Sequence, residues 1–148
     1  MAEDHSGGQA GLDLRVLAAL ERTVQAIERP LFAHIRSGNL TPAQFDVLEA
    51  LYHGGPLTVN GVIQRTLGSS GNIGVVVDNL IKSGLVTKRV DQDDRRVRYL
   101  ELSEAGSQLM TEFFPCHLQV VEATFTGLDK HDKRALIDLL RKLRKSVS

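Results

Sequence analysis

Hydrophobic residues recur at helical intervals over most of the chain. Between residues 12 and 36 apolar side chains follow one another at steps of three or four, at Leu17, Leu20, Val24, Ile27, Leu31 and Ile35. This spacing is typical of one face of an α-helix. Residues 104–125 and the residues after Asp129 repeat it. Pro30 lies inside the first helix and should bend or break it, and Pro115 should kink the second.

Shorter helices with clear start signals fill the middle of the chain. The segment LTPAQFDVLEALYHGG, residues 40–55, has Thr41 as N-cap, a proline at the first helical position and Gln44 to complete a capping box. Thr58 should cap a short helix that ends near residue 66. After the turn LGSS, a third helix is expected over residues 70–83, where a glycine ends it.

The hydrophobic period changes from 3.6 to two after residue 84. LVTKRV (85–90) and VRYLEL (97–102) predict two short strands that bracket the charged residues 91–96. Helix, short helix, turn, helix and hairpin in this order indicate a winged helix-turn-helix. We therefore expect a mainly α fold with a small β-hairpin wing over residues 41–102. The helices of residues 12–36 and 104–148 lie outside that unit.

Composition favours a single cytoplasmic domain. The chain has 148 residues, of which 42% are hydrophobic, and one cysteine, so no internal disulfide can form. No apolar run reaches the roughly 18 residues that a membrane span needs. The start, MAEDHSGGQAG (residues 1–11), has no apolar segment and is expected to be a disordered leader rather than a secretory signal.

The net charge of zero conceals an uneven distribution. Residues 1–60 carry four arginines against seven acids, net −3, whereas residues 61–100 carry seven Lys and Arg against four Asp, net +3. The middle of the chain is therefore locally basic, as contact with nucleic acid favours, although many protein surfaces carry a similar net charge.

The start of the third short helix has the residue types that read DNA bases. The second helix of a helix-turn-helix presents its N-terminal side chains to the major groove. Here those positions are small, and carry hydrogen-bonding groups or methyls: Ser69, Ser70, Gly71, Asn72, Gly74 and Val75. Serine and asparagine can bond phosphates or bases, and valine can contact a thymine methyl.

The hairpin tip combines acids with arginines. Arg95 and Arg96 can enter a minor groove, where the negative potential favours guanidinium groups. Asp94 can hold one guanidinium in place through a bidentate contact, while Asp91 and Asp93 shape the turn. The alternative is a solvated turn whose surface ion pairs contribute roughly 0–1 kcal/mol.

Three segments together resemble the MarR family of bacterial transcriptional regulators: LTPAQFDVLEALYHGGPLTV, SSGNIGVVVDNLIKSGLVTKR and DQDDRRVRYLELSEAG. The resemblance covers about residues 12–147. The family pattern Asp-x-Arg, followed after six residues by Thr or Ser, matches Asp94, Arg96 and Ser103. It implies that Arg96 enters the minor groove, that Asp94 orients it, and that Arg95 is a phosphate or second groove contact. Gly74 departs from the family, which often has Thr there, so base preference does not carry over.

The resemblance also implies partners. Members are homodimers built from their first and last helices, bind a pseudo-palindromic operator on double-stranded DNA, and repress transcription until a small aromatic or phenolic effector binds or a cysteine is oxidised. The effector cavity would lie between the dimer arms and the winged unit. Five side chains are candidates for its lining: His34, Phe45, Leu48, Tyr52 and Phe113. Each of them could instead belong to the hydrophobic core.

Cys116 admits two interpretations. It is either a small buried hydrophobe, which we favour, or a reactive thiol activated by a protonated His117. Redox-sensing members place the cysteine in the first helix, and residues 12–36 contain none. With a single cysteine and scattered histidines, neither a metal site nor a cofactor is expected.

Two other classes of function remain to be weighed. A winged helix can serve protein–protein contact or dimerisation alone, which would leave Arg95 and Arg96 without a role. An enzyme is not expected, because the chain has no glycine-rich nucleotide loop, no serine elbow and no His/acid cluster at catalytic spacing.

Overall fold

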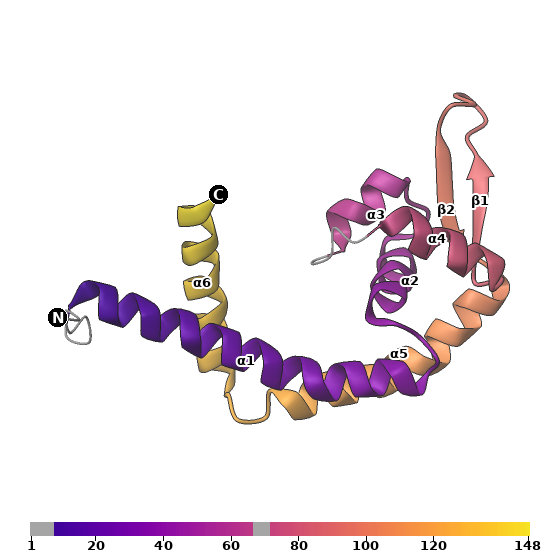
Figure 1. Ribbon diagram of the computed structural model, residues 1–148. Helices are drawn as coiled ribbons and strands as arrows, with labels where there is room; N and C mark the ends of the chain where they lie inside the picture. Colours follow the sequence, from indigo (N-terminus) through magenta and orange to yellow (C-terminus); the bar gives the residue numbers. More distant parts are fainter. Residues whose placement is uncertain (1–7, 67–71) are drawn as a thin grey trace.

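The computed structural model describes residues 8–66 and 72–148 (Figure 1). Within these ranges the chain forms six helices and one hairpin: α1 (Gln9–Ser37), α2 (Pro42–Gly54), α3 (Val59–Arg65), α4 (Ile73–Lys82), β1 (Val86–Val90), β2 (Arg98–Leu102), α5 (Glu104–Thr124) and α6 (Lys130–Val147). The strands pair antiparallel, with Lys88 opposite Leu100. The mainly helical winged fold is confirmed.

Side-chain caps begin four of the helices where the sequence predicts. The Thr41 hydroxyl accepts a hydrogen bond from the Gln44 backbone N–H at 3.2 Å, and the Gln44 side chain accepts one from the Thr41 N–H at 2.9 Å. Thr58, Ser103 and Asp129 cap α3, α5 and α6 in the same position. Each cap satisfies a backbone donor and contributes about 1 kcal/mol.

The two internal prolines do not interrupt their helices. α1 is continuous through Pro30 over 29 residues, and α5 is continuous through Pro115 over 21. Both prolines are exposed, so the carbonyl groups that lose an N–H partner can bond to water. The second half of α1, which contains Pro30, lies beside α5 (Figure 1), and this contact supports each helix near its proline. The expected break at Pro30 is therefore wrong.

The first helix also begins earlier than expected. It starts at Gln9, so residues 9–11 belong to α1 and not to a leader, while residues 1–7 lie outside the described residues. Glutamine and alanine are good helix formers, and the Gln9 amide donates to Asp13 at 3.4 Å. Hydrophobic periodicity alone cannot detect such an extension, because these residues carry no apolar stripe.

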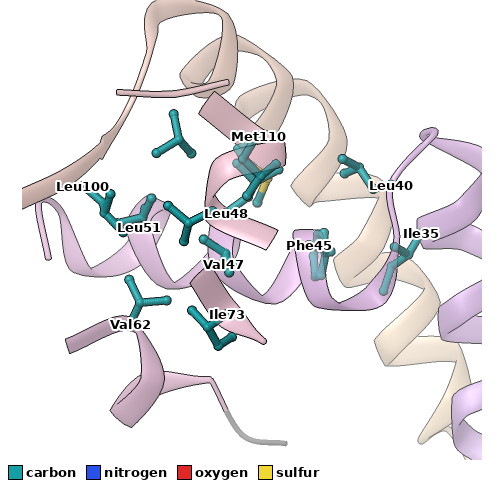
Figure 2. Packing of buried hydrophobic residues seen from close by; sticks show 13 residues of the cluster. Ile35, Leu40, Phe45, Val47, Leu48, Leu51, Val62, Ile73, Leu100 and Met110 are labelled. Carbon is teal, nitrogen blue, oxygen red and sulfur yellow. The ribbon is translucent and has the colours of Figure 1, made fainter. Parts of the chain in front are cut away.

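The core surrounds α2. Phe45, Val47, Leu48 and Leu51 of α2 are buried, and they pack with apolar side chains of the other elements (Figure 2): Val62, Ile73, Val77, Leu80, Val86, Leu100 and Met110. Leu57 adds a short bridge to β2 through reciprocal backbone hydrogen bonds with Leu100, at 3.0 and 2.7 Å. Helices α2–α4 and the hairpin therefore form one compact unit at the end of the α1–α5 arm.

The far end of the arm is not packed. α6 has no buried residue, and the apolar side chains Leu12, Leu14, Val16 and Leu17 of α1 are all exposed in the single chain. In Figure 1 α6 lies away from the winged unit, and none of the other described elements packs closely on it. No helix within residues 8–66 and 72–148 is both long and apolar enough to cross a bilayer.

Candidate nucleic-acid interface

One face of α4 is buried in the core and the opposite face is open. Ile73, Val77 and Leu80 are buried, whereas Val75 has half of its surface exposed. Asn72 and Gly74 are also exposed at the N-terminal end, and the Asn72 side chain makes no capping bond to the helix. The candidates Ser69, Ser70 and Gly71 lie outside the described residues. The three described candidates thus share the open N-terminal end of α4.

Asp91 organises the turn at the wing tip. Its Oδ2 atom accepts hydrogen bonds from the backbone N–H groups of Asp93 at 3.1 Å and Asp94 at 3.0 Å. The Asp91 N–H in turn donates to the Val97 carbonyl at 3.0 Å. Of the two acids expected to shape the turn, Asp91 makes the bonds through its side chain, whereas Asp93 contributes its backbone N–H.

Asp94 contacts Arg96 directly. Its Oδ1 atom accepts from the Arg96 backbone N–H at 3.0 Å and from the Arg96 Nε–H at 3.3 Å. The contact uses one carboxylate oxygen, so it differs from the bidentate pair expected from the sequence. It leaves the two terminal nitrogens of the guanidinium pointing to solvent, and the Arg96 side chain is 92% exposed. Arg95 is exposed as well.

Two further basic residues are fixed on the stem of the wing. Lys88 of β1 lies 3.7 Å from Asp78 of α4, an ion pair between the wing and the helix. Arg89 lies 3.6 Å from Glu101 and 5.4 Å from the centre of the Tyr99 ring. These contacts were not expected from the sequence, although the strand register that pairs Arg89 with Tyr99 follows from the hairpin itself.

Ser103, the last residue of the family pattern, joins the wing to α5. Its hydroxyl accepts from the Gly106 N–H at 3.0 Å and donates to the carbonyl of Gly84. Ser103 therefore links the start of α5 to the residue before β1, and this holds the base of the wing against the arm.

An aromatic cluster lies where the arm meets the winged unit. The His34 ring of α1 stacks on Phe113 of α5, with 4.5 Å between ring centres, and Phe45 of α2 lies 5.9 Å from Phe113. Three of the five effector-site candidates therefore contact one another. Tyr52 belongs to a neighbouring group with His53 and Phe114, and Leu48 is fully buried in the core.

His117 also belongs to this cluster, although it was not among the five effector-site candidates. It is 7% exposed, lies 4.5 Å from Phe45 and 5.6 Å from His34 between ring centres, and follows Phe113 by one helical turn. Burial, and then the neighbouring His34, lower the pKa of His117. His34 Nε2 and His117 Nδ1 are both buried, and neither has a hydrogen-bond partner within the described chain. The four-residue spacing from Phe113 was the available signal.

Cys116 is exposed, which corrects the expectation of a buried thiol. Consecutive helical residues point about 100° apart, so the inward position falls to His117 and Cys116 faces outward. The lowered pKa of His117 also disfavours the cationic form that would activate the thiol. Cys116 instead lines a groove of about 540 Å³ between α1 and α5, with Pro30, His34, Gln119, Val120, Ala123 and Thr124.

A second, smaller hollow lies beside α2. It has a volume of about 270 Å³ and is lined by Asp46, Glu49, Ala50, His53, Arg65 and Thr66. Burial raises the pKa of Asp46 and also that of Glu49, where His53 opposes the rise and Asp46 adds to it. Among the described residues, no three His, Cys, Asp or Glu side chains lie close enough to hold a metal ion.

Comparison with known proteins agrees with this geometry. The sequence model of the MarR family matches residues 39–97. The chain is 28% identical to the HTH-type transcriptional regulator MhqR of Bacillus subtilis over 130 residues, covering 88% of this chain and 90% of MhqR. It is 34% identical over 104 residues to the HTH-type transcriptional repressor NicR of Pseudomonas putida, covering 70% and 66%.

A solved structure extends the similarity over the whole fold. BpsR of Bordetella bronchiseptica superposes with a TM-score of 0.76 at 30% identity, over 88% of this chain and 98% of BpsR. That structure is described as explaining how 6-hydroxynicotinic acid regulates DNA binding by BpsR.

Proposed function

The chain belongs to the MarR family of winged-helix transcriptional regulators, and we propose that it acts in the cytoplasm as a repressor that binds a pseudo-palindromic operator as a homodimer. One observation carries the proposal. The open N-terminal end of α4 and the Asp94–Arg96 wing tip belong to one compact unit, and the Lys88–Asp78 pair connects the wing to the helix. The relatives are regulators, which agrees with a role other than catalysis.

The DNA contacts divide into two kinds. Asn72, Gly74 and Val75, with Ser69, Ser70 and Gly71 before them, enter the major groove and contact base edges and phosphates. Arg96 enters the adjacent minor groove with its aim set by Asp94, and Arg95 adds a phosphate or second groove contact.

The dimer is formed by α1, α5 and α6. All of α6 is unburied in the single chain, and it exposes an apolar stripe: Leu136, Ile137, Leu139, Leu140, Leu143 and Val147. Helices in proteins draw most of their stability from packing of an apolar face, so α6 needs a surface to pack on. A second copy supplies one, and a two-fold axis sets the two α4 helices about 34 Å apart, one turn of DNA.

The effector is a small aromatic compound bound near the junction of arm and winged unit. The stacked rings of His34 and Phe113, with Phe45 behind them, lie next to the groove that His34 also lines. A compound bound there contacts α1 and α5 and lies close to the winged unit, so it can change the separation of the two α4 helices in a dimer. The regulation of BpsR by 6-hydroxynicotinic acid supports this class of effector. Oxidation of the exposed Cys116 is the less favoured trigger.

Footprinting on the DNA upstream of the protein's own coding region tests the proposal. We expect protection of two half-sites one helical turn apart, and affinity that falls steeply as salt rises. A fragment of equal length from inside the coding region is the control. Equal affinity for both fragments, or no salt-dependent binding, would favour a winged helix used only for protein–protein contact.

A further inference from the structure

Seven exposed residues of α1 follow an unbroken repeat. Arginine and alanine alternate along the helix at steps of four and three residues: Arg15, Ala19, Arg22, Ala26, Arg29, Ala33 and Arg36. All seven are exposed, and we call them the Arg/Ala seam. Alternating steps of three and four residues place side chains in a continuous row that a second helix can follow along its length.

The four arginines of the seam have no acidic partner in their own chain. No Asp or Glu lies three or four residues before or after any of them, although such pairs commonly neutralise the exposed face of a helix. Within the described chain none of the four forms an ion pair. The Arg/Ala seam is therefore a row of positive charges that its own fold does not compensate.

The seam faces away from the surfaces that the core and the proposed dimer use. Successive residues of a helix are about 100° apart, so the apolar stripe that contains Leu17, Val24 and Ile35 lies on the opposite side of α1. Ile35 is buried in the core, and Leu17 and Val24 are exposed apolar side chains that the proposed dimer covers. Burial of the stripe leaves the Arg/Ala seam open.

The repeat of the seam and its small side chains select the partner. Seven residues of helix span about 10.5 Å, so the four arginines form a row about 31 Å long. The alanines leave room between them, and Arg15, Ala19 and Arg22 line part of a groove of about 600 Å³. A second α-helix repeats over the same distance, whereas the phosphates of double-stranded DNA follow one another about every 1.7 Å and wind around the duplex. The seam therefore matches a helix better than a nucleic acid.

We propose that the Arg/Ala seam binds an acidic α-helix of a partner protein, one that carries glutamate or aspartate at every seventh residue. Each acid of the partner lies opposite one arginine, and each alanine lets the partner helix approach closely. The association is weak and sensitive to salt, because each exposed ion pair contributes little and is screened. It does not depend on operator binding, since the seam belongs to the arm and not to the winged unit.

Fluorescence anisotropy with labelled synthetic peptides tests this. The matched peptide has four heptads, with glutamate at every seventh residue, alanine at the alternate seam positions, and alanine and glutamine elsewhere. The control peptide has the same composition, but its glutamates are five residues apart and do not share one helix face. We expect the parent protein to bind the matched peptide at least about fivefold more tightly than the control, and about tenfold less tightly in 0.5 M salt than at low salt.

Three variants separate the seam from general charge. The double change Arg22→Gln and Arg29→Gln should weaken binding of the matched peptide by about fivefold to tenfold. Ala26→Gln keeps every charge but puts a long side chain between the arginines, and it should weaken binding as well. The double change Lys133→Gln and Arg134→Gln removes the same charge from α6 and should bind as the parent does. Circular dichroism and sedimentation check that each variant is folded and dimeric.

Several results would overturn the inference. One is equal binding of the two peptides, or full binding by Ala26→Gln, since either would mean attraction by charge alone. Another is no binding of the matched peptide at millimolar concentration. Dissociation of the dimer by the changes at Arg22 and Arg29 would assign the seam to the subunit interface, and stronger binding of the seam to random duplex DNA than to the peptide would assign it to nucleic acid.

Discussion

The buried imidazole of His117 should make the stability of the fold depend on pH. Burial lowers its folded-state pKa below the value of about 6.5 that it has when unfolded. The unfolded chain therefore binds more protons in the window between the two values, and the free energy of unfolding falls as pH drops below about 6.5. Urea denaturation followed by circular dichroism between pH 5.5 and 7.5 measures this loss.

His117→Gln is the variant that tests the assignment, because glutamine does not titrate. Its free energy of unfolding should change less between pH 7 and 5.5 than that of the parent. Asp46 and Glu49 act in the opposite direction: their pKa values are raised, so the folded state binds more protons than the unfolded state, and protonation of these carboxyl groups raises the free energy of unfolding as pH falls. An unchanged pH slope in His117→Gln would contradict the role given to this residue.

The wing tip gives a second prediction at the residue scale. Arg96→Ala should weaken operator binding and reduce the salt slope by about one if the guanidinium displaces one counterion. Asp94→Ala should also weaken binding, although it removes a negative charge, because Asp94 holds the Arg96 Nε–H. Neither change should alter thermal stability much, since the Arg96 side chain is almost fully exposed.

A double-mutant cycle at fixed salt separates orientation from charge. If Asp94 acts by aiming Arg96, its loss should matter little once Arg96 is gone, and the two effects are non-additive. Tighter binding by Asp94→Ala, or simple additivity, would mean that the tip is only a solvated turn.

The wing tip and the contact between His34 and His117 differ in how far the sequence predicts them. Asp94 and Arg96 are two residues apart, so their contact is local and the turn residues around them predict it. His34 and His117 are 83 positions apart, and their contact depends on α1 and α5 lying side by side, which no local pattern specifies. The four-residue spacing between Phe113 and His117 indicates only that the two side chains lie on the same face of α5.

At the scale of elements, two glycines on different helices should respond oppositely to alanine. A Cβ at Gly106, in the first turn of α5, would overlap the backbone carbonyl oxygen of Leu85, which cannot move without displacing β1. Gly106→Ala should therefore lower the free energy of unfolding by about 2–3 kcal/mol. Thermal or urea denaturation measures the change.

Gly74→Ala is the matched control for that substitution. Gly74 is exposed near the start of α4, and an added Cβ meets only the Asn72 side chain at an ordinary 3.6 Å. Alanine should raise the free energy of unfolding by roughly 0.5–1 kcal/mol, because glycine is the weaker helix former. Tolerance of Gly106→Ala would show that the packing between α5 and β1 is looser than described, and destabilisation by Gly74→Ala would show that the start of α4 has no room for a Cβ.

Sequence signals close to a helix predict where it begins better than they predict whether a proline interrupts it. Thr41, Thr58, Ser103 and Asp129 each donate or accept within three residues, so their caps depend on sequence nearby and are found where expected. The effect of Pro30 depends instead on which side of α1 faces solvent and on the support from α5. That information is tertiary, and it explains why the expected break is absent.

At the scale of the whole molecule, the unpacked end of the arm predicts that folding and dimerisation are coupled. Leu139 is 64% exposed and Val147 is 77% exposed in the single chain, on a helix with no buried residue. Burying the apolar stripes of α1 and α6 between two copies is expected to form an interface above roughly 2,000 Å². Sedimentation of the parent should therefore show a dimer at micromolar concentration, with a melting temperature that falls on dilution.

Leu139→Glu puts a charge on that stripe and should convert the dimer to monomer. Because helices in proteins draw most of their stability from packing of an apolar face, the monomeric variant should also lose part of the helical signal of the 18 residues of α6. Ile63→Glu is the matched control: Ile63 is 47% exposed, but it lies on α3 in the winged unit, so the variant should remain dimeric. Operator affinity should fall for Leu139→Glu, since one chain can occupy only one half-site. A parent that sediments as a folded monomer, or a Leu139→Glu variant that keeps both its helicity and its dimer, would mean that α6 is stabilised within its own chain.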